Sequence, residues 1–164
     1  MAAKRPPALD RIDLKILAAL QRDGRMTNQR LAEMVALSPR ASLERVRRLE
    51  AAGIISGYQA VVELRDLTRP VNVFVEIVLE KQANRRRFEK RLASLDEVVE
   101  CWEVSGNVDY VARFVCADMV AYEETTAALL DDEALGVARI VSHVALRPVR
   151  RFSGYPESLL ARKS

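Results

Sequence analysis

Basic side chains between residues 40 and 48 have the chemistry needed to bind nucleic acid. In a helix with 3.6 residues per turn, Arg40, Arg45 and Arg48 fall on one side. The opposite, buried side is predicted to hold Leu43, Val46 and Leu49. An arginine guanidinium pairs with the O6 and N7 atoms of guanine or neutralises a phosphate. The pattern therefore indicates a helix surface that contacts duplex DNA.

Position along this helix separates the expected base contacts from the phosphate contacts. In a helix-turn-helix, the first residues of the second helix lie nearest to the base edges. We therefore expect Arg40, Ala41 and Glu44 to meet bases, and Arg48 to meet phosphate. Asn28, at the start of the preceding helix, is a further expected phosphate contact. The alternative is a solvated helix face on which Glu44 and Arg48 form a salt bridge.

A loop in the second half carries groups suited to a zwitterion. Gly106 lets backbone N–H groups approach a carboxylate, and Asp109 can accept from an ammonium group. The alternative is a plain hairpin turn, in which Gly106 has a positive φ and Asp109 bonds to its own backbone. Considered alone, these residues favour the turn.

Residues for catalysis or metal binding are few. The chain has two cysteines and one histidine, fewer than most zinc sites require. Glu100 and Glu103 should point to opposite faces of one strand, so they form no acid–base pair. The chain has no P-loop, dinucleotide-binding glycine motif or serine elbow. The sequence therefore predicts a protein without metal, cofactor or catalytic site, and an enzyme is the weakest of the alternatives.

Apolar residues at helical spacing predict three helices before Gly53. The first covers about residues 10–22. Thr27 is a suitable cap for the second, and Ser38 followed by Pro39 begins the third. The short turn between the second and third is typical of a helix-turn-helix. The apolar residues that follow predict two short strands around Gly57, which would form a wing.

The second half alternates between strand and helix patterns. Apolar residues on every second position predict a strand over Val71–Leu79. Further elements are expected at about 84–95, 98–104, 110–116, 118–130 and 137–149, in the order βαββαβ of a ferredoxin-like unit. Two helices cover only one face of such a sheet. The other face is predicted to carry Phe74, Val78, Trp102 or Cys101, and Val111 or Ala112. This uncovered face implies a partner, most simply a second copy of the chain.

The predicted fold is therefore α+β, with a winged helix-turn-helix domain over residues 1–65 and a ferredoxin-like domain over 66–164. Residues 1–60 hold 11 Lys or Arg and 6 Asp or Glu, whereas residues 61–164 hold 15 and 17. The basic first half is expected to meet a polyanion. Apolar runs are far shorter than the roughly 20 residues that span a bilayer. With no leader-like apolar segment either, we expect a cytoplasmic protein without a membrane partner.

Motifs in both halves resemble the Lrp/AsnC family of bacterial and archaeal transcription regulators, and within it the leucine-responsive branch. The first half contains LDRID at 9–13, IL at 16–17, DGR at 23–25, LA at 31–32, LSP at 37–39 and ERVRRLEAAGIISGY at 44–58. The second half contains FVEI at 74–77, VSGNVDY at 104–110 and DMVAY at 118–122. The motifs occur in the family's order, and the resemblance covers about residues 9–150.

The resemblance implies a sequence-specific DNA-binding transcription regulator whose assembly and DNA binding respond to a small amino acid. It implies dimers that join into higher oligomers and bind the effector where dimers meet. The expected effector-binding residues are Val104, Ser105, Gly106, Asn107, Val108, Asp109 and Ser142.

This chain departs from the family at two positions. Asn107 replaces the first acid of a Gly-Asp-x-Asp motif, and Ala36 stands where the turn usually has glycine. An architectural DNA-binding protein that ignores small molecules is the alternative function.

Overall fold

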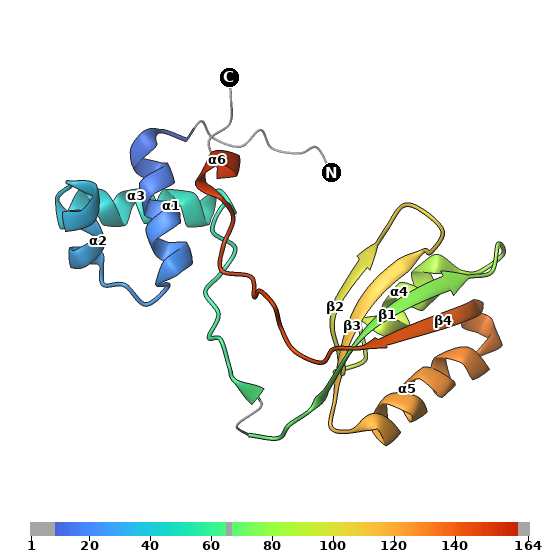
Figure 1. Cartoon of the computed structure of the whole chain (residues 1–164). Coiled ribbons are helices and arrows are strands. Elements are labelled where there is room, and N and C mark those ends of the chain that lie inside the picture. Colours follow the sequence, from blue (N-terminus) through green and yellow to red (C-terminus); the bar gives the residue numbers. More distant parts are fainter. Residues whose placement is uncertain (1–8, 65–66, 161–164) are drawn as a thin grey trace. The chain divides into compact units, whose positions relative to one another are not determined.

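The computed structural model describes residues 9–64 and 67–160, which separate into two units (Figure 1). The first unit comprises the chain up to Val61 together with the segment from Arg150, and the second is Val62–Val149. The C-terminal segment is predicted from the sequence to belong to the second domain, whereas its contacts in the structure are with the first. The C-terminal residues thus belong to the helical unit.

Three helices form the helix-turn-helix: α1 (Arg11–Arg22), α2 (Asn28–Val35) and α3 (Pro39–Ala51). The predicted caps are confirmed, because the side chains of Thr27 and Ser38 accept hydrogen bonds from the first turns of α2 and α3. Asp10 caps α1 and forms a reciprocal capping box with Asp13. These caps fix the three helix starts, and with them the direction of α3.

The C-terminal segment packs on α1. The backbone N–H of Tyr155 donates to the side-chain oxygen of Gln21 at 2.6 Å. Leu160, the last residue of α6 (Glu157–Leu160), packs against the core that includes Ile16 and Leu49. The hydrophobic core of the first unit therefore draws on both ends of the described chain.

The two short strands expected around Gly57 are not formed, since the described residues from 52 to 64 contain no strand. Val61 and Val62 are 88% and 58% exposed, and neither pairs with a strand of the described structure. Tyr58 instead donates its hydroxyl to Glu50 at 3.0 Å. The apolar pattern is present, but a strand also needs a pairing partner.

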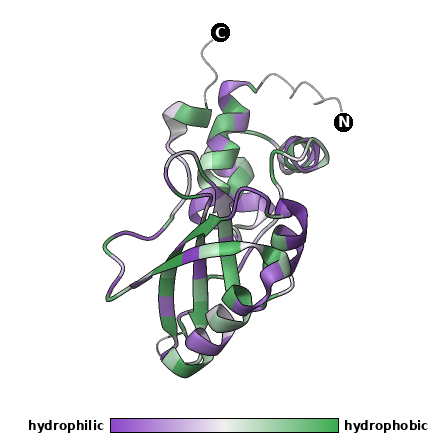
Figure 2. Ribbon diagram, turned by 90° about the vertical axis from the view of Figure 1, so that its right-hand side faces the viewer, coloured by the Kyte–Doolittle hydropathy of each residue, from purple (hydrophilic) through white to green (hydrophobic). Residues whose placement is uncertain are grey.

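The second unit has a four-stranded antiparallel sheet in the order β2-β3-β1-β4. Its strands are β1 (Val71–Leu79), β2 (Val98–Glu103), β3 (Tyr110–Cys116) and β4 (Val137–Val144). The helices are α4 (Arg85–Leu92) and α5 (Met119–Asp131), and a 3₁₀ turn follows at Glu133–Leu135. The predicted βαββαβ order is confirmed. Apolar residues line the strands, as the hydropathy colouring shows (Figure 2).

The two faces of this sheet differ in burial. Val73, Val75 and Ile77 are buried on the face that packs against the helices. Phe74 and Trp102 lie on the other face and remain 45% and 66% exposed. The register pairs Trp102 with Val111 and Cys101 with the buried Ala112, which resolves both alternatives left open by the sequence. Trp102 and Val111 are on the open face, whereas Cys101 and Ala112 are on the helix side.

Ala36 ends α2 in the left-handed conformation, with φ 55° and ψ 48°. This backbone conformation costs an L-residue about 1 kcal/mol or more relative to glycine. We therefore expect Ala36→Gly to raise the free energy of unfolding of the first unit by about 1 kcal/mol. Thermal unfolding followed by circular dichroism measures the effect. An unchanged or lower melting temperature would show that glycine's extra freedom in the unfolded chain cancels the gain.

Candidate nucleic-acid interface and effector loop

The buried side of α3 differs from the predicted one. Ser42 and Leu49 are buried, Arg45 and Val46 are partly buried, and Leu43 is 38% exposed. The prediction that Leu43 faces the core is therefore wrong. The helix is rotated relative to the prediction because Arg45 turns inward to reach carboxylates on the first helix.

Two acidic residues at the start of α1 bind two arginines of α3. Asp13 is fully buried, and its two oxygens accept from Arg45 at 2.9 Å and from Arg48 at 2.6 Å. Asp10 accepts from Arg45 at 2.6 Å. We call Asp10, Asp13, Arg45 and Arg48 the α1–α3 ion cluster. It ties α3 to the rest of its unit.

Within the α1–α3 ion cluster, Asp10 and Arg45 favour each other's charged forms. The backbone N–H of Asp13 and the Arg45 guanidinium lower the pKa of Asp10 to about 2. The two carboxylates, Asp10 first, raise the pKa of Arg45 in turn. Only 26% of the Arg45 side chain is exposed, so its prediction as an outward-facing residue is wrong. Arg48 is about half exposed and retains a surface towards solvent.

The outward face of α3 is formed by Arg40, Leu43, Glu44 and Arg47, all of which are exposed. Arg40 and Glu44 form an i,i+4 pair at 3.4 Å, in place of the Glu44–Arg48 pair considered from the sequence. Arg40 is 90% exposed, so this pair is weak and leaves the guanidinium accessible. Arg47, which the helical projection places on the flank of the helix, is also exposed here. The sequence did contain a signal for the inward turn of Arg45. Asp10 and Asp13 at the start of α1 are acids, and buried acids require cationic partners.

Ala41 lies in the first turn of α3, and Asn28, the first residue of α2, contacts the same end of that helix. Ala41 is partly buried, and its N–H donates to the Ser38 side chain at 3.2 Å. The Asn28 amide donates to the carbonyl oxygen of Pro39 at 2.7 Å. Asn28 therefore connects the start of α2 to the first residue of α3. In the described structure its amide nitrogen therefore bonds to α3 and helps to hold that helix in place.

The carboxylate of Asp109 is engaged within its own subunit. One oxygen accepts from the backbone N–H of Leu79 at 2.8 Å, and the other from Arg85 at 2.5 Å. These bonds, that from Leu79 first, lower the pKa of Asp109. Asp109 thus joins the end of β1 to the start of α4. Both carboxylate oxygens are already bonded, so Asp109 is not a free acceptor for an ammonium group.

The rest of the loop is open. Ser105, Gly106 and Asn107 are exposed, while Val104 and Val108 are partly buried. Gly106 has φ +127°, a conformation that other residues rarely adopt, and a Cβ added to it would meet no atom within 4 Å. Backbone N–H groups at this tip are the ones that an external carboxylate can reach.

Ser142 lies on β4, in register with Val75, and shares a hydrogen bond with the hydroxyl of Tyr122. The loop joins β2 to β3, and β1 lies between β3 and β4. Strands β3 and β4 are therefore two strand spacings apart, which amounts to roughly 10 Å. A single subunit therefore does not bring Ser142 and the loop together.

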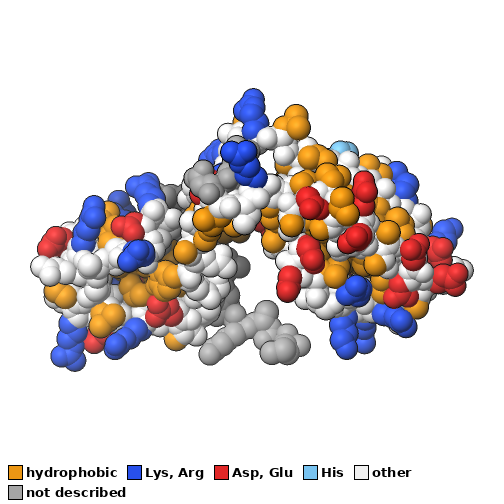
Figure 3. Space-filling view, turned by 90° about the horizontal axis from the view of Figure 1, so that it is seen from below, with side chains coloured by type: hydrophobic (Ala, Val, Ile, Leu, Met, Phe, Trp, Pro, Cys, Tyr) orange, Lys and Arg blue, Asp and Glu red, His pale blue; other side chains and the backbone are white. Residues whose placement is uncertain are grey.

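Among the described residues, no three potential ligands are grouped closely enough to hold a metal ion. In the same residues, no helix has the length and apolarity needed to cross a bilayer. Basic side chains are prominent on the first unit, and the visible face of the second carries acidic, apolar and basic side chains (Figure 3).

Two family models match the chain. Residues 9–56 match a winged helix-turn-helix DNA-binding model, and residues 72–154 match the Lrp/AsnC ligand binding domain. The Bkd operon transcriptional regulator of Pseudomonas aeruginosa is 42% identical over 150 residues, which cover 90% of this chain and 97% of that protein. The leucine-responsive regulatory protein of Escherichia coli is 45% identical over 124 residues, covering 74% and 76%.

Solved structures share the fold. A transcriptional regulator of Neisseria meningitidis in complex with L-Met superposes with a TM-score of 0.86 at 31% identity, covering 93% of this chain and 99% of that one. The leucine response regulatory protein LrpA of Mycobacterium tuberculosis gives a TM-score of 0.74 at 30% identity, covering 87% and 96%.

Proposed function

The chain belongs to the Lrp/AsnC family of transcription regulators, and we propose that a small amino acid controls its binding to specific duplex DNA. The observation that carries this proposal is the outward face of α3, where Arg40, Glu44 and Arg47 stand free of the core. The α1–α3 ion cluster holds α3 on the side that faces α1. This arrangement suits insertion into the major groove.

The roles of the site residues differ with their position on α3 and with the bonds that they already make. We propose that Arg40 and Glu44, near the start of α3, contact base edges, with Ala41 close to them. Arg47 and the exposed part of Arg48 contact phosphates. Arg45 and Asn28 support DNA binding by holding α3 in place, in keeping with the bonds they make.

Arg40→Ala is expected to weaken binding to a preferred duplex by about 1–3 kcal/mol and to leave binding to random duplex nearly unchanged. Arg47→Ala is expected to weaken both alike, because a phosphate contact carries no sequence information. Fluorescence anisotropy on a duplex selected from a random library measures both. If the two variants have the same effect on every sequence, α3 does not read bases in this orientation.

We propose that the effector binds at the loop formed by Val104, Ser105, Gly106, Asn107 and Val108. The open tip supports this, since its backbone N–H groups are free to approach a carboxylate. Asp109 then holds the loop in place through Leu79 and Arg85. Ser142 can contribute only from a second subunit, because β1 separates it from the loop within one chain.

The open sheet face supports a homodimer, and we propose that dimers join further. A second candidate function is an architectural DNA-binding protein, favoured by the loss of an acid at Asn107. Thermal unfolding with each of the twenty protein amino acids separates the two. A ligand that binds only the folded protein raises the melting temperature. An amino-acid-responsive regulator shows such a rise, whereas an architectural protein shows none.

A further inference from the structure

The basic residues of the second unit are concentrated on and beside one short helix. Residues 62–149 hold 11 Lys or Arg and 16 Asp or Glu, so the unit as a whole is acidic. Residues 81–91, which include most of α4, nevertheless hold six of those basic residues and a single acid. The positive charge of this unit is therefore gathered at one place in its fold.

The outward side of α4 carries three of these charges. Phe88 and Leu92 are the buried residues of the helix and define its inward side. With 3.6 residues per turn, Arg86, Arg87 and Lys90 fall on the opposite side, and all three are exposed. We call these three residues the α4 basic face. No apolar side chain lies among them.

The unit itself does little to neutralise the α4 basic face. Arg87 approaches Asp132 only to 4.0 Å, and the two side chains are 57% and 40% exposed, so this pair is weak. Among the described residues, neither Arg86 nor Lys90 takes part in an ion pair. The face therefore presents charges that are available to an external anion.

Helix stability does not account for these charges. Arg86 and Arg87 lie in the first turn of α4, where the helix dipole favours acids, and that turn contains none. Arg86 and Lys90 are like charges four residues apart, a spacing at which such pairs repel each other. Arg87 and Arg91 form a second pair of this kind. Both effects disfavour the free helix, and a bound polyanion would offset them.

We propose that the α4 basic face binds the phosphate backbone of duplex DNA, as a second contact besides that of α3. Lys and Arg contact phosphates without regard to base sequence, and each contact releases counterions. A protein surface suits this face less well, because the cores of protein interfaces are depleted of lysine and rely on apolar and aromatic side chains. Since the two units belong to one chain, DNA held by α3 is at a high effective concentration for α4. The inference does not depend on which residues of α3 read the bases.

Neutralising two of the charges in the full-length protein tests the proposal. Arg86→Gln combined with Lys90→Gln is expected to lower the affinity about tenfold or more at roughly 0.1 M salt, both for the selected duplex and for random duplex. The slope of log affinity against log salt concentration should become less steep by about two to four, because a dimer loses about four phosphate contacts. Fluorescence anisotropy over a series of salt concentrations measures both quantities.

Two control proteins separate a local contact from other effects of charge. Arg86→Lys combined with Lys90→Arg keeps both charges and should bind DNA as the wild type does. Arg69→Gln combined with Arg147→Gln removes the same charge at exposed positions of the second unit outside α4, and should change the affinity little. Neutralising α4 should not lower the melting temperature, because it relieves a repulsion. Thermal unfolding of each variant checks this.

The outcomes separate this inference from the proposed function. If the neutralised α4 variant keeps wild-type affinity and salt slope, α4 does not contact DNA, whereas the assignment of α3 stands on the Arg40→Ala test. An equal loss in the Arg69 and Arg147 control would attribute the effect to overall charge and overturn the inference. A lower mass of the neutralised variant without DNA, measured by analytical ultracentrifugation, would show that the face binds another copy of the chain instead. A wild type that binds no duplex DNA would contradict both proposals. Weaker binding and a shallower slope at unchanged mass support the DNA contact.

Discussion

Asp13→Ala is expected to lower the free energy of unfolding of the first unit by about 3 kcal/mol, because it removes a fully buried carboxylate from two arginines. Arg45 then keeps only Asp10 as a partner while still largely covered. The capping box of α1 is lost with the same carboxylate. The second unit has its own core and should unfold as before.

Chemical unfolding of the full chain, followed by circular dichroism, measures this loss. Glu33→Ala, an exposed acid on α2, is the matched control and should change stability little. DNA binding by Asp13→Ala should fall together with the folded fraction. Wild-type stability in Asp13→Ala would mean that the α1–α3 ion cluster does not hold the reading helix.

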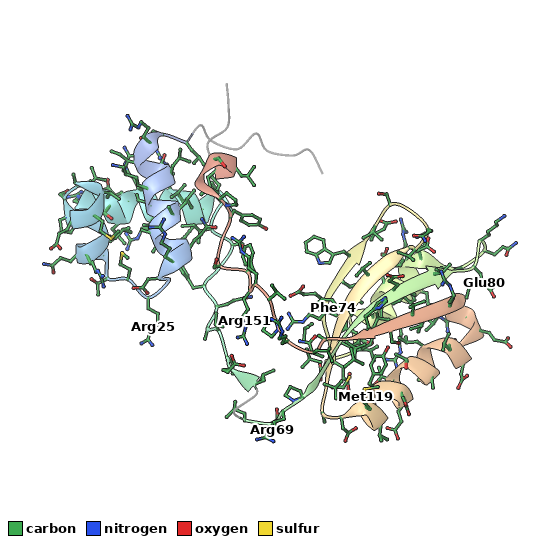
Figure 4. The ribbon with its side chains drawn as sticks, viewed as in Figure 1. Arg25, Arg69, Phe74, Glu80, Met119 and Arg151 are labelled. Atoms are coloured by element: carbon green, nitrogen blue, oxygen red, sulfur yellow. The ribbon has the colours of Figure 1, made fainter. Side chains whose placement is uncertain are left out.

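Phe74→Arg is expected to lower the affinity for a two-half-site duplex by about 10²–10⁴, because it should separate the subunits of the proposed homodimer. Phe74 is 45% exposed on the open sheet face, in register with Arg113 and His143 (Figure 4). The acids on this face, Glu100 and Glu76, already contact Arg113 and His143, so a guanidinium introduced at position 74 would have to lose its water on dimer formation without an acid of its own. Two reading helices would then no longer be presented together.

Analytical ultracentrifugation gives the mass, and anisotropy with the same duplex gives the affinity. Val120→Arg places the same charge at a 62% exposed position on α5 and serves as the control. It should leave mass and affinity unchanged. A Phe74→Arg protein that stays dimeric and binds DNA normally would place the subunit interface elsewhere.

Much of the fold follows from local chemistry that can be read along the chain. Thr27, Ser38 and Pro39 specify helix starts through their own backbone and side-chain groups, and the structure confirms each. Alternation along Val71–Leu79 specifies a strand with one buried face in the same local way. The conformation at Ala36 could not be predicted in the same way, because alanine departs there from the usual glycine, and the structure shows that the turn is left-handed all the same.

The candidate site was less predictable, because its side chains bond to residues that are far away in the sequence. Arg45 is 32 residues from Asp13 along the chain, and Asp109 is 24 from Arg85. A helical projection of residues 39–51 contains no information about carboxylates on another helix. It therefore placed Arg45 outward and Leu43 inward, and the structure reverses both. Asp109 similarly has the right chemistry for an ammonium group but is already bonded.

The residues after α3 illustrate a further limit. An apolar pattern becomes a strand only when another strand pairs with it, and Val61 and Val62 pair with none in the described structure. The place of the C-terminal segment depends on Gln21 and Tyr155, which are 134 residues apart. No local pattern specifies such a contact.

The most direct test of the central claim is one DNA-binding titration of the full-length protein, with and without the amino acid that raises its melting temperature. The duplex is the one selected from a random library. We expect the amino acid to change the apparent affinity by about 5–150-fold, the range typical of coupled sites. Titrating the amino acid against the DNA complex should give the same factor. Superimposable DNA-binding curves at saturating amino acid would contradict effector control of DNA binding.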